Sequence, residues 1–236
     1  MLIKVCAIRG PEAERDVESL AGAGVDLVGL WHGVPGGHAD LQRDELVRVA
    51  GAARAHGLEP VLVTFGRDAA ALARAARDSG ATWVQLHAYQ LPHVVAELKQ
   101  SLRGLGVKVM KVLHVRGQRC LDLRLADAYA RAGVDAFALD VATADGSVGS
   151  TGESIAPAVA ASVADRLSRP FFLAGGIDAA SSERYGDLLR RPGFAGIDVD
   201  SAARDGEGRL QRGRIKAIDE AWRGAAPRGE RRVGLR

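Results

Sequence analysis

The chain has 236 residues, of which 47% are hydrophobic and 26% are charged, and its formal net charge is +3 at pH 7. This length suits one large domain or two small ones and allows a sizeable hydrophobic core. The excess positive charge lies in residues 224–236, which hold four arginines and one glutamate, so residues 1–223 are neutral overall. A balanced body has no general attraction for nucleic acid, and we expect none as a partner.

Residues 224–236 are also rich in Gly and Pro. This composition predicts a basic, flexible C-terminal tail after a domain that spans residues 1–223. The alternative is an arm that binds phosphate groups, but the tail has no interleaved aromatic residue to stack a base.

Neither a membrane span nor a secretory signal is indicated, because no apolar run reaches roughly 18 residues and no charged-then-apolar leader opens the sequence. We therefore expect a cytoplasmic location without membrane partners. The two cysteines, Cys6 and Cys120, match no CxxC pattern. Neither a disulfide framework nor a metal site of that kind is predicted.

One pattern recurs along the chain, in which a stretch rich in Ala, Arg and Leu ends in a glycine and a short apolar segment follows. A glycine in this place is typical of a helix C′ position, which needs positive φ. Apolar residues recur at helical spacing between the segments, as at Leu46, Val49, Ala50 and Ala53. The glycines interpreted in this way are Gly24, Gly57, Gly80, Gly106, Gly133 and Gly193.

The apolar segments predict the strands of a parallel α/β fold. They lie near residues 2–6, 25–31, 60–65, 82–87, 107–113, 135–140, 171–174 and 195–199. A series of eight strand–helix units with no Gly/Ser/Pro-rich linker favours a single-domain (β/α)8 TIM barrel over an open doubly wound sheet.

The first predicted strand ends at Cys6, just before the Gly10-Pro11 breaker. In parallel α/β folds, ligands bind at the carboxyl ends of the strands, so a thiol there can face a substrate. The plainer interpretation is a buried structural cysteine, since free Cys is among the most often buried residues.

Polar residues close several of the otherwise apolar strands. A set of this kind is what an active site at the carboxyl face of a barrel needs, although any one member could be a cap or a hydrogen-bonded core group. The set comprises Cys6, Trp31, His32, Thr64, Gln85, His87, Lys111, His114, Asp140, Gly175, Gly176, Asp198 and Asp200.

Short motifs in the sequence are similar, in order and spacing, to those of the phosphoribosylanthranilate isomerase family, the barrel enzyme of the tryptophan pathway. The resemblance extends to about residue 220. The motifs that carry it are Lys4-Val5-Cys6-Ala7-Ile8-Arg9, Gln85-Leu86-His87, Leu139-Asp140, Gly149-Ser150-Thr151-Gly152, Leu173-Ala174-Gly175-Gly176 and Gly196-Ile197-Asp198-Val199-Asp200-Ser201.

This resemblance implies an Amadori rearrangement, in which an aminoaldose opens and becomes an aminoketose. It implies that Asp140 is the general acid for the ring oxygen and that Cys6 is the general base for the C2 proton. An acid and a base on opposite sides of the substrate suffice for this chemistry, so no cofactor and no metal are expected. A thiol suits the second role because its ordinary pKa, about 8.5, can be tuned.

The resemblance also implies a small phosphorylated sugar-arylamine as substrate and a monomer or homodimer as the assembly. Backbone N–H groups of glycine-rich loops would hold the phosphate. We assign phosphate binding to Gly152, Gly175, Gly176 and Ser201, although a tight turn alone would also explain Gly175-Gly176. We assign contacts with the rest of the substrate to Arg9, His32, His38, Gln85 and His87.

The sequence departs from the family pattern at the contacts to the substrate. The family has an Arg after the second strand that grips the anthranilate carboxylate, whereas residues 32–40 here hold His32 and His38 and no Arg. A neutral imidazole is a poor substitute for a bidentate guanidinium. After the last strand Asp200 adds a carboxylate beside the expected phosphate, which is repulsive unless Arg204 compensates it or Asp200 turns away.

Three functions are compatible with these residues. The first is the family activity with altered contacts. The second is a diverged enzyme for a different aminosugar or aryl substrate, in specialised metabolism, with residues 32–40 rebuilt for an aglycone without a carboxylate. The third is a barrel that only binds a ligand, against which the presence of both Cys6 and Asp140 argues, because a binder has no use for that pair.

Overall fold

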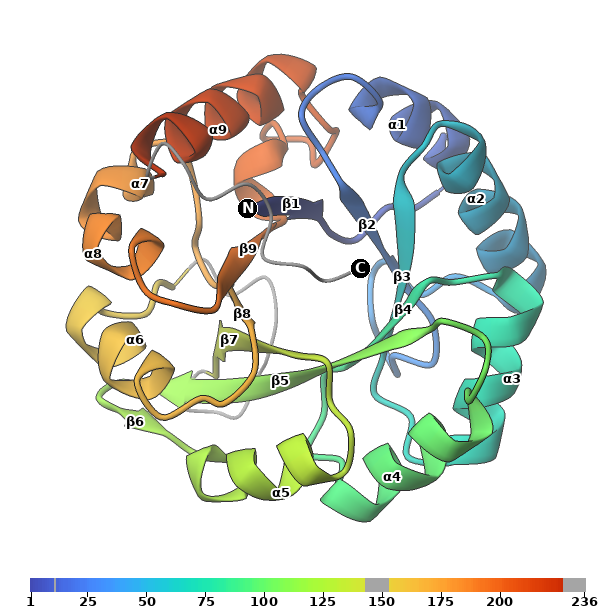
Figure 1. Cartoon of the computed structure of the whole chain (residues 1–236). Coiled ribbons are helices and arrows are strands. Elements are labelled where there is room, and N and C mark those ends of the chain that lie inside the picture. The colour runs from blue at the N-terminus through green and yellow to red at the C-terminus, as the bar shows by residue number, and fades with distance from the viewer. Residues whose placement is uncertain (11, 143–152, 227–236) are drawn as a thin grey trace.

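A computed structural model describes residues 1–10, 12–142 and 153–226. Parallel strands form a closed barrel, in which β1 pairs with both β2 and β9, and β4 pairs with β5 (Figure 1). The predicted (β/α)8 fold is therefore confirmed. In barrel order the strands are β1 (Leu2–Val5), β2 (Leu27–Trp31), β3 (Glu59–Thr64), β4 (Trp83–Leu86), β5 (Lys108–Arg116), β7 (Ala136–Val141), β8 (Phe171–Leu173) and β9 (Phe194–Val199).

The helices surround the barrel (Figure 1). Asp68 begins α3 by accepting hydrogen bonds from the amides of Ala70 and Ala71, and Pro92 and Pro157 occupy first-turn positions, where a missing N–H costs nothing. The helices are α1 (Ala13–Leu20), α2 (Arg43–Ala55), α3 (Ala69–Ser79), α4 (Pro92–Ser101), α5 (Ala126–Arg131), α6 (Pro157–Ala164), α7 (Ser181–Arg184), α8 (Gly186–Leu189) and α9 (Arg212–Ala225), with 3-10 turns η1 (Leu123–Leu125) and η2 (Ser201–Ala203).

All six glycines predicted to end the helices have positive φ, but only Gly57, Gly80 and Gly133 lie within two residues of a helix end. Gly80, for example, caps α3 with φ 65° and ψ 31°. The other three, Gly24, Gly106 and Gly193, lie further along the loops that follow α1, α4 and α8. The apolar faces predicted for the helices are buried, as at Leu46, Val49, Ala50 and Ala53 of α2.

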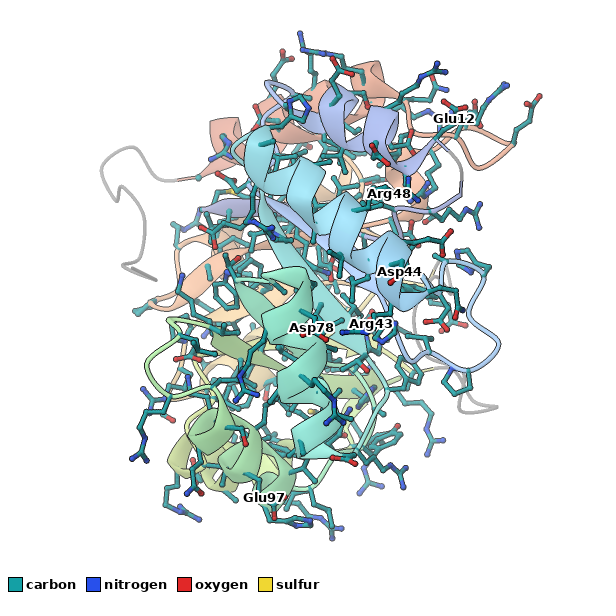
Figure 2. All side chains as sticks on the ribbon, turned by 90° about the vertical axis from the view of Figure 1, so that its right-hand side faces the viewer. Glu12, Arg43, Asp44, Arg48, Asp78 and Glu97 are labelled. Atoms are coloured by element: carbon teal, nitrogen blue, oxygen red, sulfur yellow. The ribbon has the colours of Figure 1, made fainter. Side chains whose placement is uncertain are left out.

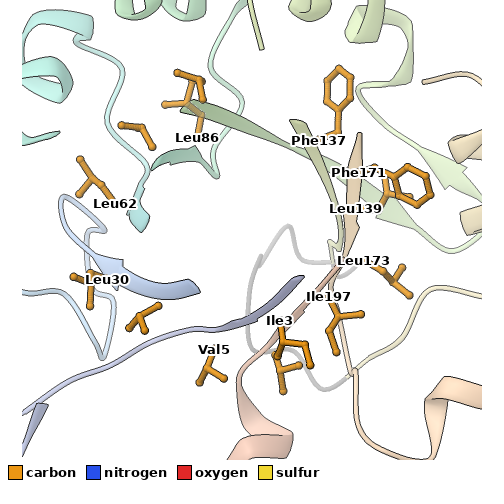
Figure 3. Close-up of a cluster of buried hydrophobic side chains, with 14 of the residues drawn as sticks. Ile3, Val5, Leu30, Leu62, Leu86, Phe137, Leu139, Phe171, Leu173 and Ile197 are labelled. Carbon is orange, nitrogen blue, oxygen red and sulfur yellow. The ribbon is translucent and has the colours of Figure 1, made fainter. Parts of the chain in front are cut away.

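Two apolar layers lie on the two sides of the strands because successive side chains alternate. One layer fills the space between barrel and helices and includes Ile3, Val5 and Leu30, which point away from the barrel axis (Figure 3). The other fills the barrel itself, with Trp83 and Phe172 in edge contact at 6.3 Å between ring centroids. The barrel is thus packed with side chains and open to chemistry only at its ends.

The outer faces of the helices are charged, as expected for a solvated surface (Figure 2). Arg43 of α2 pairs with Asp78 of α3 at 2.7 Å, and Arg48 of α2 pairs with Glu14 of α1. Exposed pairs of this kind each contribute only about 0–1 kcal/mol. They tie neighbouring helices together without determining the fold. No helix within the described ranges is long and apolar enough to cross a membrane.

The fifth barrel strand is longer than predicted. The sequence suggested 107–113, whereas β5 runs to Arg116 and turns back at Gly117, which has φ 57°, into the antiparallel pair β6 (Arg119–Cys120). His114 consequently lies within a strand and is fully buried. At the other end of the chain α9 reaches Ala225; residues 227–236 lie outside the described residues, so the basic tail stays a prediction.

Ala7, the residue after Cys6, adopts a left-handed backbone conformation with φ 59°. Its side chain is fully buried, and its carbonyl accepts a hydrogen bond of 2.8 Å from Arg204. A residue with a Cβ is strained at positive φ, typically by about 1–2 kcal/mol. The turn that orients Cys6 is therefore held by its surroundings against a local cost.

We expect Ala7→Val to lower the free energy of unfolding by roughly 2 kcal/mol or more, because a β-branched residue is more strained at positive φ and the site has no spare room. Ala7→Gly should change it by less than about 1 kcal/mol, since relief of strain offsets lost burial and added chain entropy. Urea unfolding followed by circular dichroism measures both. A valine variant as stable as the parent would contradict the strain at this turn.

Candidate active site

Cys6 lies directly after β1, where its amide donates to the Val199 carbonyl of β9 at 2.8 Å. Lys4 is two residues earlier and therefore points to the same side, into the barrel. Its Nζ atom lies 2.6 Å from Asp198 Oδ2 and 3.4 Å from Cys6 Sγ. Lys4 and Asp198 are opposite each other in the β1–β9 ladder, so the sheet register itself builds this cluster.

A second donor reaches the sulfur from β2. Trp31 Nε1 lies 3.2 Å from Cys6 Sγ. Gly29, on the same strand, leaves the room for this arrangement, because a Cβ there would lie 2.6 Å from Sγ and 3.1 Å from Lys4 Cε. Two N–H donors on one sulfur favour its thiolate form, which is the form that can accept a proton.

Burial opposes that preference in the resting site. It raises the pKa of Cys6 to about 11, although Lys4 acts to lower it. Burial also raises the pKa of Asp198 beyond what its bond to Lys4 can offset. Burial acts to lower the pKa of Lys4, but Asp198 and Cys6 together raise it above its usual value. The cluster therefore rests with a neutral thiol beside a charged lysine.

Asp140 closes β7 and is buried. Its Oδ1 accepts from the amide of Val141 at 2.8 Å, and its Oδ2 lies 3.4 Å from His87 Nε2. Although burial acts to raise the pKa of Asp140, His87 and the amide bond lower it below the usual value. In the resting site this carboxyl group is therefore ionised at neutral pH.

His87 is held in place by Phe65 and His114. Its ring stacks on Phe65 at 5.2 Å and meets the ring of His114 edge-on at 6.1 Å. His114 Nε2 lies 2.8 Å from the His87 carbonyl, and its Nδ1 lies 2.7 Å from Asp122. His114, fixed by these two contacts, also acts to lower the pKa of Asp140.

Several buried polar atoms in this region make no hydrogen bond within the described part of the chain. They include Gln85 Oε1, Asp198 Oδ1 and His87 Nδ1. Buried polar atoms are normally satisfied, so a group of open ones at the mouth of a barrel indicates a polar ligand. Among the same residues, no group of three His, Cys, Asp or Glu is placed to hold a metal ion.

The expected phosphate loops follow β8 and β9. Gly175 and Gly176 have φ of 80° and 57°, and a Cβ on Gly175 would lie 2.7 Å from Val141 Cγ2 and 3.3 Å from Asp140 Oδ1. Gly175 is therefore required by space as well as by conformation. Ser201 begins η2, directly beyond β9. Gly152 lies outside the described residues.

The segment after β2 folds back on itself. Leu41 donates its amide to the Trp31 carbonyl at 2.9 Å, and Asp40 accepts from the amide of Val34 at 3.1 Å. His32 Nδ1 lies 2.8 Å from the Leu41 carbonyl, so this ring is tied to the loop. His38 packs against Trp31 with 5.0 Å between ring centroids.

Asp200 is compensated as the sequence required. Arg204 Nε lies 2.8 Å from Asp200 Oδ1, and Arg204 is itself buried. The same guanidinium donates to the carbonyls of Cys6 and Ala7, both at 2.8 Å, and to that of Gly208 at 3.1 Å. It therefore joins the loop after β9 to the loop that carries Cys6.

The structure brings Cys6, Gln85, His87 and Asp140 to one end of the barrel, as predicted. It also brings Trp31 and Asp198, which the sequence placed at strand ends without a function, into contact with Cys6 or Lys4, and it adds Lys4, which the sequence named only within a motif. The i, i+2 spacing of Lys4 and Cys6 could have revealed that these two residues are neighbours. Lys111 is buried outside the barrel, where its Nζ donates to backbone carbonyls, including that of Ala88 at 2.8 Å.

Comparisons with known proteins agree on one family. The family model described as "N-(5'phosphoribosyl)anthranilate (PRA) isomerase" matches residues 39–219. The chain is 30% identical over 209 residues to N-(5'-phosphoribosyl)anthranilate isomerase 2 of Methanosarcina mazei, covering 88% of each chain.

Solved structures agree in fold. The phosphoribosyl anthranilate isomerase of Thermus thermophilus superimposes with a TM-score of 0.75 at 20% identity, over 95% of this chain and 99% of that one. A phosphoribosyl anthranilate isomerase in complex with reduced 1-(o-carboxyphenylamino)-1-deoxyribulose 5-phosphate has a TM-score of 0.71 at 18% identity and the same coverage.

We expect Trp31→Phe to raise the pKa of Cys6 further, because the change removes one N–H donor from Sγ without altering any charge. The 13Cβ shift of labelled cysteine, followed against pH in a Cys120→Ser background, reports this ionisation alone. Trp222→Phe is the matched control, since Trp222 Nε1 donates to the Asp178 carbonyl, away from Cys6. Equal titration curves for parent and Trp31→Phe would mean that this donor does not tune the thiol.

Proposed function

Because the chain belongs to the N-(5'-phosphoribosyl)anthranilate isomerase family, we propose that it converts N-(5'-phosphoribosyl)anthranilate to 1-(o-carboxyphenylamino)-1-deoxyribulose 5-phosphate. The observation that carries this proposal is the pair of buried groups, Cys6 with its two N–H donors and Asp140 with His87, at one end of the barrel. The comparisons favour this activity over a different substrate and over simple ligand binding.

Ring opening is the first step. Asp140, as the general acid, donates its proton to the furanose oxygen while the C1–O bond breaks. The nitrogen lone pair forms the C1=N bond, which leaves a protonated Schiff base. His87, 3.4 Å from Asp140 Oδ2, stabilises the carboxylate that results.

Proton removal from C2 is the second step. The cationic Schiff base withdraws electrons from C2, and the thiolate of Cys6 takes the C2 proton. The C–H electrons form the C1=C2 bond and neutralise the nitrogen. The enolamine then tautomerises to the aminoketose, so the reaction is an internal redox change that balances without an external oxidant or reductant.

In the resting site the proton that catalysis needs on Asp140 is on Cys6 instead. A neutral Cys6 with a pKa near 11 and an ionised Asp140 differ from the active pair only by the position of one proton. Lys4 and Trp31 stabilise the thiolate once it forms. The entering substrate, with its phosphate and carboxylate charges, raises the proton affinity of Asp140.

The loops after β8 and β9 suit the phosphate. Left-handed glycines at Gly175 and Gly176 let backbone N–H groups approach an anion closely, and Ser201 adds a hydroxyl at the start of η2. The pair of Arg204 with Asp200 removes the repulsion that the latter would exert. Gln85 and His87 present open polar atoms to the sugar.

The reaction belongs to tryptophan biosynthesis. We further propose a cytoplasmic enzyme, which the two free cysteines, Cys6 and Cys120, support because disulfides are favoured in oxidising compartments. We propose a monomer or homodimer as the assembly. The structure of monomers made from a dimeric isomerase of Thermotoga maritima has been solved, so this fold occurs as a monomer and as a dimer.

The proposed function predicts rescue of a tryptophan auxotroph that lacks this isomerase. Cys6→Ala and Asp140→Asn should each abolish rescue and lower kcat by at least about 100-fold, because each removes one proton-transfer group. Unchanged thermal unfolding of the variants would show that the barrel is intact. Rescue by either variant at parental growth rate would exclude the assigned roles.

The positions of the two pKa values predict a flat pH profile. Below the Cys6 pKa of about 11, each unit of rising pH increases the thiolate fraction of Cys6 about tenfold. Above the lowered pKa of Asp140, the same rise decreases the protonated fraction of Asp140 about tenfold. These effects cancel, so kcat/KM should stay constant from about pH 7, above the second phosphate ionisation near 6, to about pH 9.5. A profile with a clear maximum inside this window would contradict the assignment of protons.

A further inference from the structure

The proposed substrate, on which this inference rests, carries two anionic groups, a phosphate and the ring carboxylate of the anthranilate. A carboxylate that leaves water for a partly buried site needs charged or hydrogen-bonding partners. The segment after β2 (residues 32–40) has no Arg or Lys, and His32 is tied to the Leu41 carbonyl. Any cation that pairs with the ring carboxylate therefore comes from another element.

Three cationic side chains lie close to Cys6 or its loop. Lys4 is paired with Asp198, and Arg204 is paired with Asp200. Arg9, three residues after Cys6, forms no ion pair with a carboxylate within residues 1–10, 12–142 and 153–226. Its guanidinium is thus available to an anion from outside the chain.

Arg9 lines a cavity of about 720 Å3 at this edge of the barrel. His38 and Arg204 line the same cavity. His38 packs on Trp31, whose Nε1 lies 3.2 Å from Cys6 Sγ. The contacts of His38 and Trp31 therefore connect the cavity that holds Arg9 to the thiol of Cys6.

Charges of both signs line this cavity, since Asp16 lies within the electrostatic reach of both Arg9 and Arg204. Burial lowers the pKa of His38, and the charges of Arg9 and Arg204 lower it further, although Asp200 acts in the opposite direction. His38 is thus a neutral aromatic wall beside two guanidinium groups. A flat aromatic ring that bears a carboxylate is complementary to such a place.

We propose that Arg9 binds the ring carboxylate of the substrate, with His38 and Trp31 lining the aromatic part of that subsite. The specificity for an ortho-carboxylated arylamine then lies in the loop between β1 and α1. That loop also carries Cys6, so recognition of the aglycone and removal of the C2 proton share one segment.

The test compares Arg9→Gln with Arg15→Gln on two substrates. Arg15 lines the same cavity, is exposed and pairs with Glu12 at 2.8 Å, so its loss removes the same charge without touching the subsite. The substrates are N-(5'-phosphoribosyl)anthranilate and the analogue in which hydrogen replaces the ring carboxylate. Arg9→Lys is a third variant that keeps the charge but not the fork of donors.

We expect Arg9→Gln to lower kcat/KM for the carboxylated substrate by about 10- to 100-fold, mainly through KM, because a charge-assisted bidentate contact is lost. The analogue should react equally with parent and Arg9→Gln. Arg9→Lys should recover part of the loss, and Arg15→Gln should match the parent on both compounds.

Two results would overturn the inference while leaving the proposed function intact. One is parental kcat/KM in Arg9→Gln on the carboxylated substrate; the other is an equal loss on both compounds, which indicates a structural role. Failure of the parent enzyme on both compounds would instead refute the proposed function itself. An Arg15→Gln variant as impaired as Arg9→Gln would show that general charge, not a specific contact, attracts the substrate.

Discussion

The buried ion pair between Lys4 and Asp198 is the constraint on which the site depends. It lies inside the barrel at 2.6 Å, between strands that close the sheet. Two charges removed from water are costly unless each holds the other, so neither can be changed alone without leaving a buried charge unpaired. This requirement fixes the β1–β9 register and places an ammonium group 3.4 Å from the sulfur of Cys6. The thiol that we propose as the general base therefore lies beside a lysine that the barrel holds in an ion pair.

A second group of polar and charged side chains surrounds Asp140 on β7, and β8 separates this strand from β9, which carries Asp198. His87, the amide of Val141 and His114 lower the pKa of Asp140, whereas burial raises the pKa of Asp198. The two carboxyl groups lie near enough for Asp140 to raise the pKa of Asp198. Two buried carboxyl groups of one site therefore differ in proton affinity because their surroundings differ. Here the separation arises from hydrogen bonding on one side and burial on the other.

The apolar periodicity of the helices and the regular recurrence of strand segments predicted the barrel, because both are local properties of the sequence. They also predicted Cys6, Asp140 and His87, since residues that end parallel strands must meet at one rim. They did not predict the contacts of Arg204 with the carbonyls of Cys6 and Ala7, which join residues nearly 200 positions apart. Nor did they predict the β5–β6 hairpin, which buries His114 inside a strand. Partners of this kind depend on tertiary packing and leave no periodic signal.

The pair of Asp200 and Arg204 has an evolutionary consequence. Because Arg204 is buried and also supports the turn at Ala7, replacing either partner alone removes a buried ion pair beside the loop that carries Cys6. A lineage can acquire or lose the pair only through a compensated change at both positions. Close relatives should therefore hold both residues or neither, and the two columns of an alignment should covary. The two loops would then be inherited as one unit, so grafting one of them between homologues succeeds only with the other.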